Sequence, residues 1–96
     1  MAHYAASKGG LAAMTKALAM ELADKGVTVN HIPIFYVDTP MLRAAPLDRD
    51  AVSAAAPMKR PGTAGEVAAA CAYLVSDDAA YVTGQPLSLN GGRYLE

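Results

Sequence analysis

The sequence predicts an α/β fold, and three neighbouring features in its first third support this. Residues 5–25 carry apolar side chains at helical spacing, which predicts one long helix. Gly26 directly follows Lys25, and a glycine after a cation in the last turn is a typical helix end. Residues 27–32 are rich in β-branched side chains and predict a strand. A helix, a tight glycine and a short strand together indicate half of a βαβ unit.

The predicted first helix has two rows of side chains that can pair with other helices. One row is an apolar stripe made of Leu11, Leu18 and Leu22, with Met14 nearby. The other row consists of small residues spaced by four, namely Ala5, Gly9, Ala13 and Ala17. Since small side chains let another backbone come close, we expect this helix to associate with a partner helix.

Capping residues mark the start of the next helix. Asp38 or Thr39 is a candidate N-cap, with Pro40 at the first helical position. Residues 40–60 are rich in alanine and interrupted by prolines. This pattern predicts short helices in a mobile loop.

A second cap begins the last predicted helix. Thr63 is followed three residues later by Glu66, the spacing of a capping box, and the helix is expected to run to about residue 75. Residues 81–85 then predict a turn, and residues 87–89 predict a short strand.

Composition and charge narrow the class of protein. The 96 residues are enough for one small domain, and 53% of them are hydrophobic while 18% are charged, so part of the apolar surface is expected to need a partner. The formal net charge of -1 gives no basis for binding nucleic acid or an anionic membrane. No apolar run approaches the ~20 residues of a membrane span. His3 and His31 are not spaced as a metal pair with any carboxylate, so no metal site is expected. We expect a soluble cytoplasmic protein.

One pair of residues has the chemistry of an acid/base unit. Tyr4 and Lys8 are four residues apart and therefore share a helix face. A phenol titrates near pH ~10 in water, and a nearby ammonium favours phenolate and lowers that pKa. The pair can thus move a proton to or from a hydroxyl or carbonyl oxygen. On spacing alone this is a weak signal, because a tyrosine and an ordinary solvated lysine occur at this distance in many helices.

The segments around this pair form a pattern that covers essentially the whole chain. Residues 4–11 resemble the Y-x-x-x-K motif of the short-chain dehydrogenase/reductase family, and the similarity continues in the family's order and spacing. It runs through residues 18–23, 26–30, 36–41, 57–62, 66–68, 74–85 and 90–92. The resemblance is therefore far more specific than any single motif.

The resemblance implies the C-terminal portion of a Rossmann-type, doubly wound parallel sheet that lacks the N-terminal nucleotide-binding strands. Residues 1–96 would be the catalytic and substrate-side segment of one domain. The implied activity is hydride transfer between NAD or NADP and an alcohol or ketone, with 3-oxoacyl compounds as one candidate substrate class. The family also commonly pairs the helix of residues 5–25 in dimers, which implies a homo-oligomer.

Site residues follow from the same resemblance. Tyr4 would exchange a proton with the substrate oxygen, while Lys8 would lower the pKa of Tyr4 and hydrogen-bond the nicotinamide ribose. Val37, through its backbone, and Thr39 match positions that contact the nicotinamide. The loop from about residue 41 to 58 matches the substrate-binding region, with wall candidates at Met41, Leu42 and Met58.

Two departures from the family pattern bear on function. The glycine-rich phosphate turn and the family's catalytic serine, which precede the tyrosine, are not found in these residues. The usual Pro-Gly after the strand is replaced by Ile34-Phe35, so a side chain stands where a glycine lets the backbone approach the nicotinamide. We therefore expect this polypeptide alone to be inactive and not to bind NAD(P)(H). The alternative is a truncated, non-catalytic remnant that persists by self-association.

Overall fold

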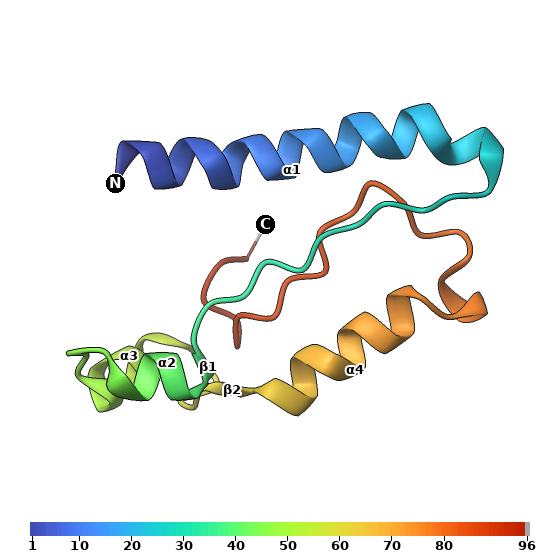
Figure 1. Cartoon of the computed structure of the whole chain (residues 1–96). Helices are drawn as coiled ribbons and strands as arrows, with labels where there is room; N and C mark the ends of the chain where they lie inside the picture. Colours follow the sequence, from blue (N-terminus) through green and yellow to red (C-terminus); the bar gives the residue numbers. More distant parts are fainter. Residues whose placement is uncertain (96) are drawn as a thin grey trace. The chain divides into compact units, whose positions relative to one another are not determined.

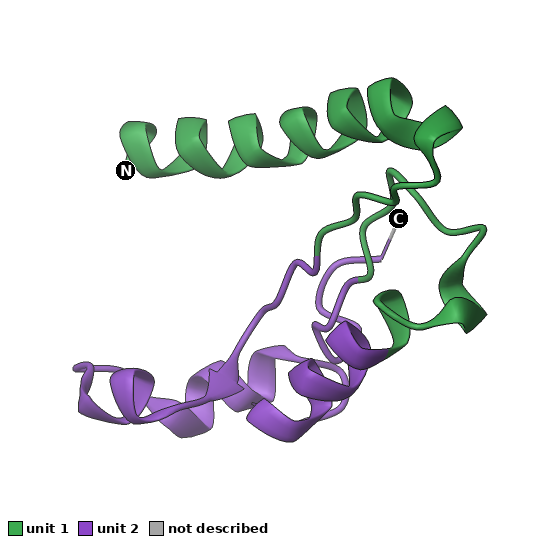
Figure 2. Cartoon of the chain, turned by 45° about the vertical axis from the view of Figure 1, so that its right-hand side comes forward, with its two compact units in different colours: residues 1–31, 73–87 green, residues 32–72, 88–96 purple. Residues whose placement is uncertain are grey.

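The computed structural model describes residues 1–95, which divide into two compact units (Figure 2). Unit 1 comprises residues 1–31 and 73–87, and unit 2 comprises residues 32–72 together with the described residues from 88 onward. The elements in chain order (Figure 1) are helix α1 (Ala2–Leu22), 3-10 helix η1 (Ala23–Lys25), strand β1 (Val37–Asp38), helices α2 (Pro40–Ala44) and α3 (Arg49–Ala55), strand β2 (Gly62–Thr63), helix α4 (Ala64–Leu74) and 3-10 helix η2 (Asp77–Ala79).

Helix α1 confirms the predicted long first helix, although it begins three residues earlier, at Ala2. It continues into η1 and ends at Gly26, which has a φ of 73° and donates its N–H to the carbonyl of Ala23. The left-handed conformation explains the glycine, because other residues adopt it only with strain. In unit 1 the helix buries Thr15 and Ala19, whose side chains are small.

Residues 27–32 do not form the predicted strand. In unit 1 the structure has a single parallel bridge, between His31 and Pro86. Backbone bonds flank this bridge, since the N–H of Gly84 donates to Val29, that of His31 to Gln85 and that of Leu87 to His31. The ladder is interrupted after them because Pro33 has no N–H to donate. Side chains add to this pairing, since Asn30 and Thr83 also join the segment to the turn at residues 82–85.

The sheet in unit 2 is small and parallel. Strands β1 and β2 pair with Val37 opposite Gly62 and Asp38 opposite Thr63. A second parallel contact is the isolated bridge of Ile34 with Leu89, so the predicted strand at residues 87–89 is also reduced to a bridge. The mixture of helices with parallel pairing confirms an α/β fold.

The predicted helix caps are confirmed. Thr39, rather than Asp38, caps α2, because its hydroxyl accepts a hydrogen bond from the N–H of Leu42 at 3.4 Å. Pro40 is the first helical residue, where its missing N–H costs nothing. At α4, Thr63 and Glu66 form a reciprocal capping box, each side chain accepting from the other's backbone N–H at 3.0 Å.

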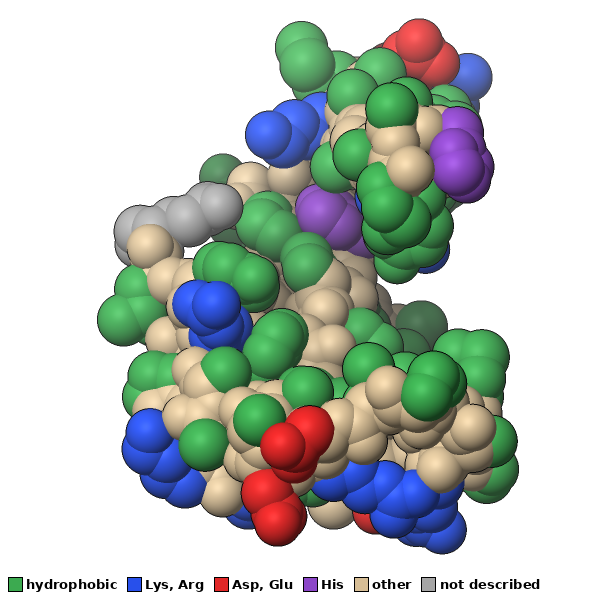
Figure 3. Space-filling model, turned by 90° about the vertical axis from the view of Figure 1, so that its left-hand side faces the viewer, with side chains coloured by type: hydrophobic (Ala, Val, Ile, Leu, Met, Phe, Trp, Pro, Cys, Tyr) green, Lys and Arg blue, Asp and Glu red, His purple; other side chains and the backbone are tan. Residues whose placement is uncertain are grey.

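Few large side chains are buried. Within residues 1–95, the buried hydrophobic residues other than Tyr36 and Val37 are all alanines: Ala19, Ala56, Ala70 and Ala79. Apolar side chains are correspondingly visible on the space-filling surface (Figure 3). The exposed ones include Leu11, Met14 and Met20 of α1. No helix among residues 1–95 is long and apolar enough to span a membrane.

Candidate functional site

Tyr4 and Lys8 lie one helical turn apart on α1, as their spacing predicts. The ammonium nitrogen of Lys8 is 5.6 Å from the centroid of the Tyr4 ring, which is the range of a cation–π contact. Tyr4 is 51% exposed, so the residue is accessible to a ligand. Ser7, between them, donates its hydroxyl to the Tyr4 carbonyl at 2.8 Å.

This geometry gives the pair two distinct capacities. The phenol hydroxyl of Tyr4 is a donor and acceptor that can exchange a proton with an alcohol or carbonyl oxygen. Lys8 forms no ion pair within residues 1–95, so its three N–H donors remain available to hydroxyl oxygens of a ligand. The pair therefore combines a proton carrier with a fixed positive charge.

Val37 and Thr39 belong to unit 2, where the first is buried and the second caps a helix. Val37 lies in β1 and is only 3% exposed. The hydroxyl of Thr39 accepts from Leu42 at the start of α2. Between them, Asp38 receives two hydrogen bonds from the Arg43 guanidinium, at 2.7 and 3.0 Å. These bonds lower the pKa of the Asp38 carboxyl.

Phe35 stands at the position where the family pattern has glycine, and its half-buried ring contacts two other side chains. It meets the ring of Tyr94 edge to face, with centroids 6.1 Å apart. The Arg93 guanidinium lies 5.7 Å from the Phe35 centroid and 4.8 Å from that of Tyr94. The backbone N–H of Phe35 donates to the carbonyl of Leu89 at 3.1 Å. Arg93 and Tyr94 carried no recognisable signal in the sequence, because they contact Phe35 across almost 60 positions.

The predicted loop residues do not gather at one place. Met41 is 78% exposed and lies in α2 together with Leu42, whereas Met58, 61% exposed, lies after α3. Of the three, only Met58 lines a cavity in unit 2, of about 300 Å³. Val37 also lines this cavity, whereas Thr39 does not. The structure thus brings one predicted cofactor residue and one predicted substrate residue to the same cavity.

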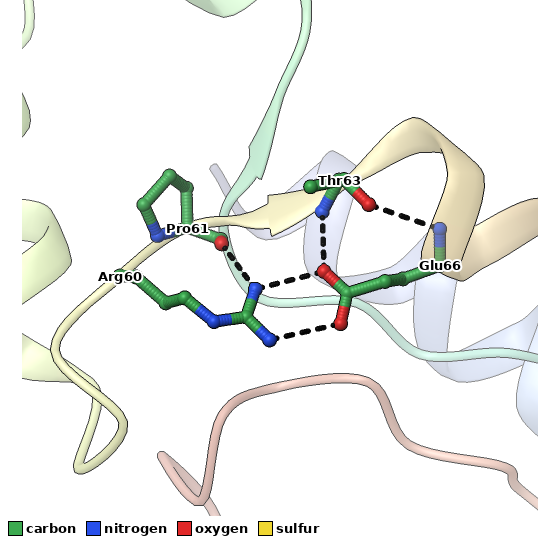
Figure 4. A network of polar contacts seen from close by, with 4 residues as sticks. All are labelled: Arg60, Pro61, Thr63 and Glu66. Carbon is green, nitrogen blue, oxygen red and sulfur yellow. Dashed lines mark hydrogen bonds and ion pairs between the residues drawn. The ribbon is translucent and has the colours of Figure 1, made fainter.

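A charged network lies in the wall of this cavity (Figure 4). The Arg60 guanidinium donates to both carboxylate oxygens of Glu66, at 2.8 and 3.0 Å, and to the carbonyl of Pro61 at 3.0 Å. Glu66 also accepts from the N–H of Thr63, so one carboxylate serves both the ion pair and the helix cap. The bonds from Arg60 and Thr63 lower the pKa of Glu66 to about 2. Residues 1–95 contain no group of histidine, cysteine and acidic side chains that could hold a metal.

Comparison of the sequence with known proteins identifies a family. Residues 1–93 match the family described as enoyl-(acyl carrier protein) reductase. The 3-oxoacyl-(acyl-carrier-protein) reductase FabG of Escherichia coli (strain K12) is 46% identical over 95 residues, which are 98% of this chain and 39% of that protein. Nodulation protein G of Azospirillum brasilense is 50% identical over 91 residues, which are 94% of this chain and 37% of that protein.

The chain belongs to the short-chain dehydrogenase/reductase family. It spans about 39% of the length of its reductase relatives, such as FabG of Salmonella typhimurium, which is 45% identical over 95 residues. The resemblance predicted from the Y-x-x-x-K segment and the motifs that follow it is therefore confirmed.

Proposed function

We propose that this chain is the catalytic and substrate-side segment of an NAD- or NADP-dependent oxidoreductase. The reaction is hydride transfer between a nicotinamide and an alcohol or ketone. The observation that carries the proposal is the pairing of Tyr4 with Lys8 on α1, 5.6 Å apart, in a chain of the short-chain dehydrogenase/reductase family. The names of the FabG relatives extend it to 3-oxoacyl thioesters as substrates.

Each residue has a defined role in this proposal. Tyr4 donates a proton to the substrate oxygen on reduction and accepts it on oxidation. Lys8 stabilises the phenolate form by its charge and binds the ribose hydroxyls. The backbone of Val37 contacts the nicotinamide, and Thr39 lies beside it at the start of α2. A bound nicotinamide supplies or accepts the hydride.

The residues present fit only part of such a cofactor. The exposed ammonium of Lys8 suits ribose hydroxyls, and the backbone of Val37 suits an amide. A pyrophosphate needs backbone N–H groups at a glycine-rich turn, which residues 1–96 lack. We accordingly propose that these residues act together with a nucleotide-binding half in a doubly wound sheet, and that alone they neither bind NAD(P)(H) nor turn over. The parallel pairing of β1 with β2 supports such a sheet.

A second, non-catalytic function has an observation in its favour. Helix α1 exposes the side chains of Leu11, Met14 and Met20 and the small-residue row at positions 5, 9, 13 and 17. A self-associating remnant would cover these faces with a second copy. The catalytic proposal includes the same homo-oligomer, in the cytoplasm, so association alone does not separate the two functions.

A chimera separates them. Residues 1–96 replace the matching segment of the E. coli FabG relative, with Ile34→Pro and Phe35→Gly added in a parallel version. We expect NAD(P)H-dependent reduction of a 3-oxoacyl thioester, which Tyr4→Phe lowers by about 10³–10⁴-fold while cofactor affinity stays nearly unchanged. Ser7→Ala is the matched control, since it leaves the phenol in place. A folded chimera in which Tyr4→Phe retains most of its activity would refute the catalytic role and favour the remnant.

A further inference from the structure

The turn at residues 90–93 of unit 2 places a side-chain amide directly before a glycine. The N–H of Arg93 donates to the carbonyl of Asn90 at 3.0 Å and closes the turn. Gly91 and Gly92 have φ values of 58° and 84°, as the two central residues of a type I′ turn do. Because Gly91 has no Cβ, its backbone nitrogen is open to the side chain that precedes it. This nitrogen can therefore attack the side-chain carbonyl carbon of Asn90 and close a cyclic imide.

The two reacting groups differ in how they are held. The backbone N–H of Gly91 donates to no acceptor within residues 1–95, so no hydrogen bond of this nitrogen has to break before it reacts. The Asn90 side chain is held at both ends, since its oxygen accepts from the N–H of Gly92 and its nitrogen donates to the carbonyl of Tyr94, both at 3.0 Å. That nitrogen is the leaving group, so the bond to Tyr94 must open before the amide can turn and the ring can close.

A contact of the Phe35 ring controls how readily this bond opens. Tyr94 is 62% exposed, and its ring meets that of Phe35 edge to face with centroids 6.1 Å apart. The Arg93 guanidinium lies 5.7 Å from the Phe35 centroid and 4.8 Å from that of Tyr94. The Phe35 backbone is itself fixed, because its N–H donates to the carbonyl of Leu89 at 3.1 Å. The Phe35 ring thus keeps residues 93 and 94 beside the Asn90 amide.

We propose that Asn90 is a site of spontaneous deamidation, and that the contact of Phe35 with Arg93 and Tyr94 sets its rate. The backbone nitrogen of Gly91 gives its proton to hydroxide and forms a bond to the side-chain carbonyl carbon of Asn90. The bond from this carbon to the amide nitrogen breaks, and that nitrogen takes a proton from water and leaves as ammonia. Water then opens the cyclic imide at either carbonyl, which gives aspartate or isoaspartate. Water is consumed and ammonia is released, and no group is oxidised or reduced.

Either product alters the end of unit 2. An aspartate at position 90 still accepts from the N–H of Gly92, but a carboxylate oxygen then faces the carbonyl of Tyr94 where a donor stood. An isoaspartate lengthens the main chain within the turn. Both products therefore release Tyr94, and the altered residue lies in the wall of the unit 2 cavity. The change requires neither substrate nor cofactor, so it is independent of the catalytic proposal.

The test follows the 96-residue chain by peptide mass spectrometry during incubation at mildly alkaline pH. Asn30, the other asparagine of the sequence, is an internal control, because a histidine follows it and its side chain makes two hydrogen bonds within unit 1. We expect conversion at Asn90 to be several-fold faster than at Asn30, to rise with pH and to give isoaspartate as well as aspartate. Equal rates at the two asparagines, or a product without isoaspartate, would overturn the proposal.

Two variants test the part played by the Phe35 contact. Tyr94→Ala removes the ring but keeps the carbonyl that accepts from Asn90, so conversion at Asn90 should become about twofold to tenfold faster. Phe35→Leu removes the same contact from the other side and should accelerate conversion to a similar extent, so the test does not depend on the folding of one variant. Tyr81→Ala is the matched control, since Tyr81 is 102% exposed and lies in unit 1, and its rate should equal that of the unaltered chain. Equal rates in all of these chains would overturn the control by Phe35.

Discussion

Replacing Asn30 by alanine should lower the stability of unit 1, because its side chain joins two segments that are far apart in the sequence. The amide nitrogen of Asn30 donates to the carbonyl of Val82 at 2.9 Å, and its oxygen accepts from the N–H of Gln85 at 3.0 Å. Both bonds join parts of the chain separated by more than 50 positions. In Asn30→Ala both bonds disappear, and the half-buried carbonyl of Val82 loses a partner.

The expected loss follows from these two bonds. Each contributes about 0.5–1.5 kcal/mol net, so Asn30→Ala should lower the free energy of unfolding by about 2 kcal/mol. For a chain of this size that corresponds to a Tm lower by about 8–16 °C. Asn30→Asp keeps the acceptor for Gln85 but sets an oxygen against the carbonyl of Val82, so it should be destabilised by a comparable amount.

Urea unfolding followed by circular dichroism at neutral pH, at one fixed protein concentration, measures the effect. Gln85→Ala is the control, because it removes only an exposed amide that donates to Thr83 within the same turn, at 3.3 Å. That variant should stay within about 0.5 kcal/mol of the unaltered chain. If Asn30→Ala changed stability no more than Gln85→Ala, the two side-chain bonds of Asn30 would add nothing to the backbone bonds that join residues 27–31 to the turn.

Three further predictions address the chemistry, the helix cap and a glycine. In the chimera, Lys8→Ala should weaken both activity and cofactor binding. Raising the pH toward ~10 should partly restore the activity of Lys8→Ala but not that of Tyr4→Phe. Equal recovery of both variants would argue against Tyr4 as the proton carrier. Because the folded-state pKa of Glu66 is depressed to about 2, its stabilising effect is complete above its unfolded pKa of 4.5 and is lost as the pH falls from 4.5 to about 2. Glu66→Gln keeps the cap but not the charge, so its difference in unfolding free energy from the unaltered chain should shrink over that window, and a constant difference would contradict this. Gly84→Ala should lower the free energy of unfolding by about 1–3 kcal/mol, since it combines a φ of +70° with a Cβ only 3.3 Å from that of Ala19. Gly26→Ala has a φ of +73° but open space around it, so in the same urea measurement it should show only the cost of the left-handed backbone.

Features that depend on residues close together in the chain were predictable from the sequence. The stop at Gly26, the cap at Thr39 and the reciprocal capping box of Thr63 with Glu66 all involve groups within four positions of one another. The shared helix face of Tyr4 and Lys8 belongs to the same class. Such patterns are readable because helix geometry alone sets which groups meet.

The predicted strands at residues 27–32 and 87–89 show the limit of this reasoning. The β-branched composition of residues 27–32 is real, but a strand exists only where a neighbour offers both donors and acceptors along its edge. Here the pairing is limited to isolated bridges because Pro33 has no N–H to continue the ladder, and the side chain of Asn30 adds to the backbone bonds of its neighbours. Composition describes one chain segment, whereas pairing is a property of two.

The sequence by itself determined the family, the α/β class and the shared face of Tyr4 and Lys8 on α1. Only the tertiary structure decided that Phe35 is clamped by Arg93 and Tyr94, that Met58 and Val37 share a cavity, and that Met41 and Leu42 do not reach it. These contacts join residues up to almost 60 positions apart, and no local spacing encodes them. Which distant side chains meet is set by the path of the chain between them, because packing and hydrogen bonding select one arrangement of the whole unit rather than of any single segment.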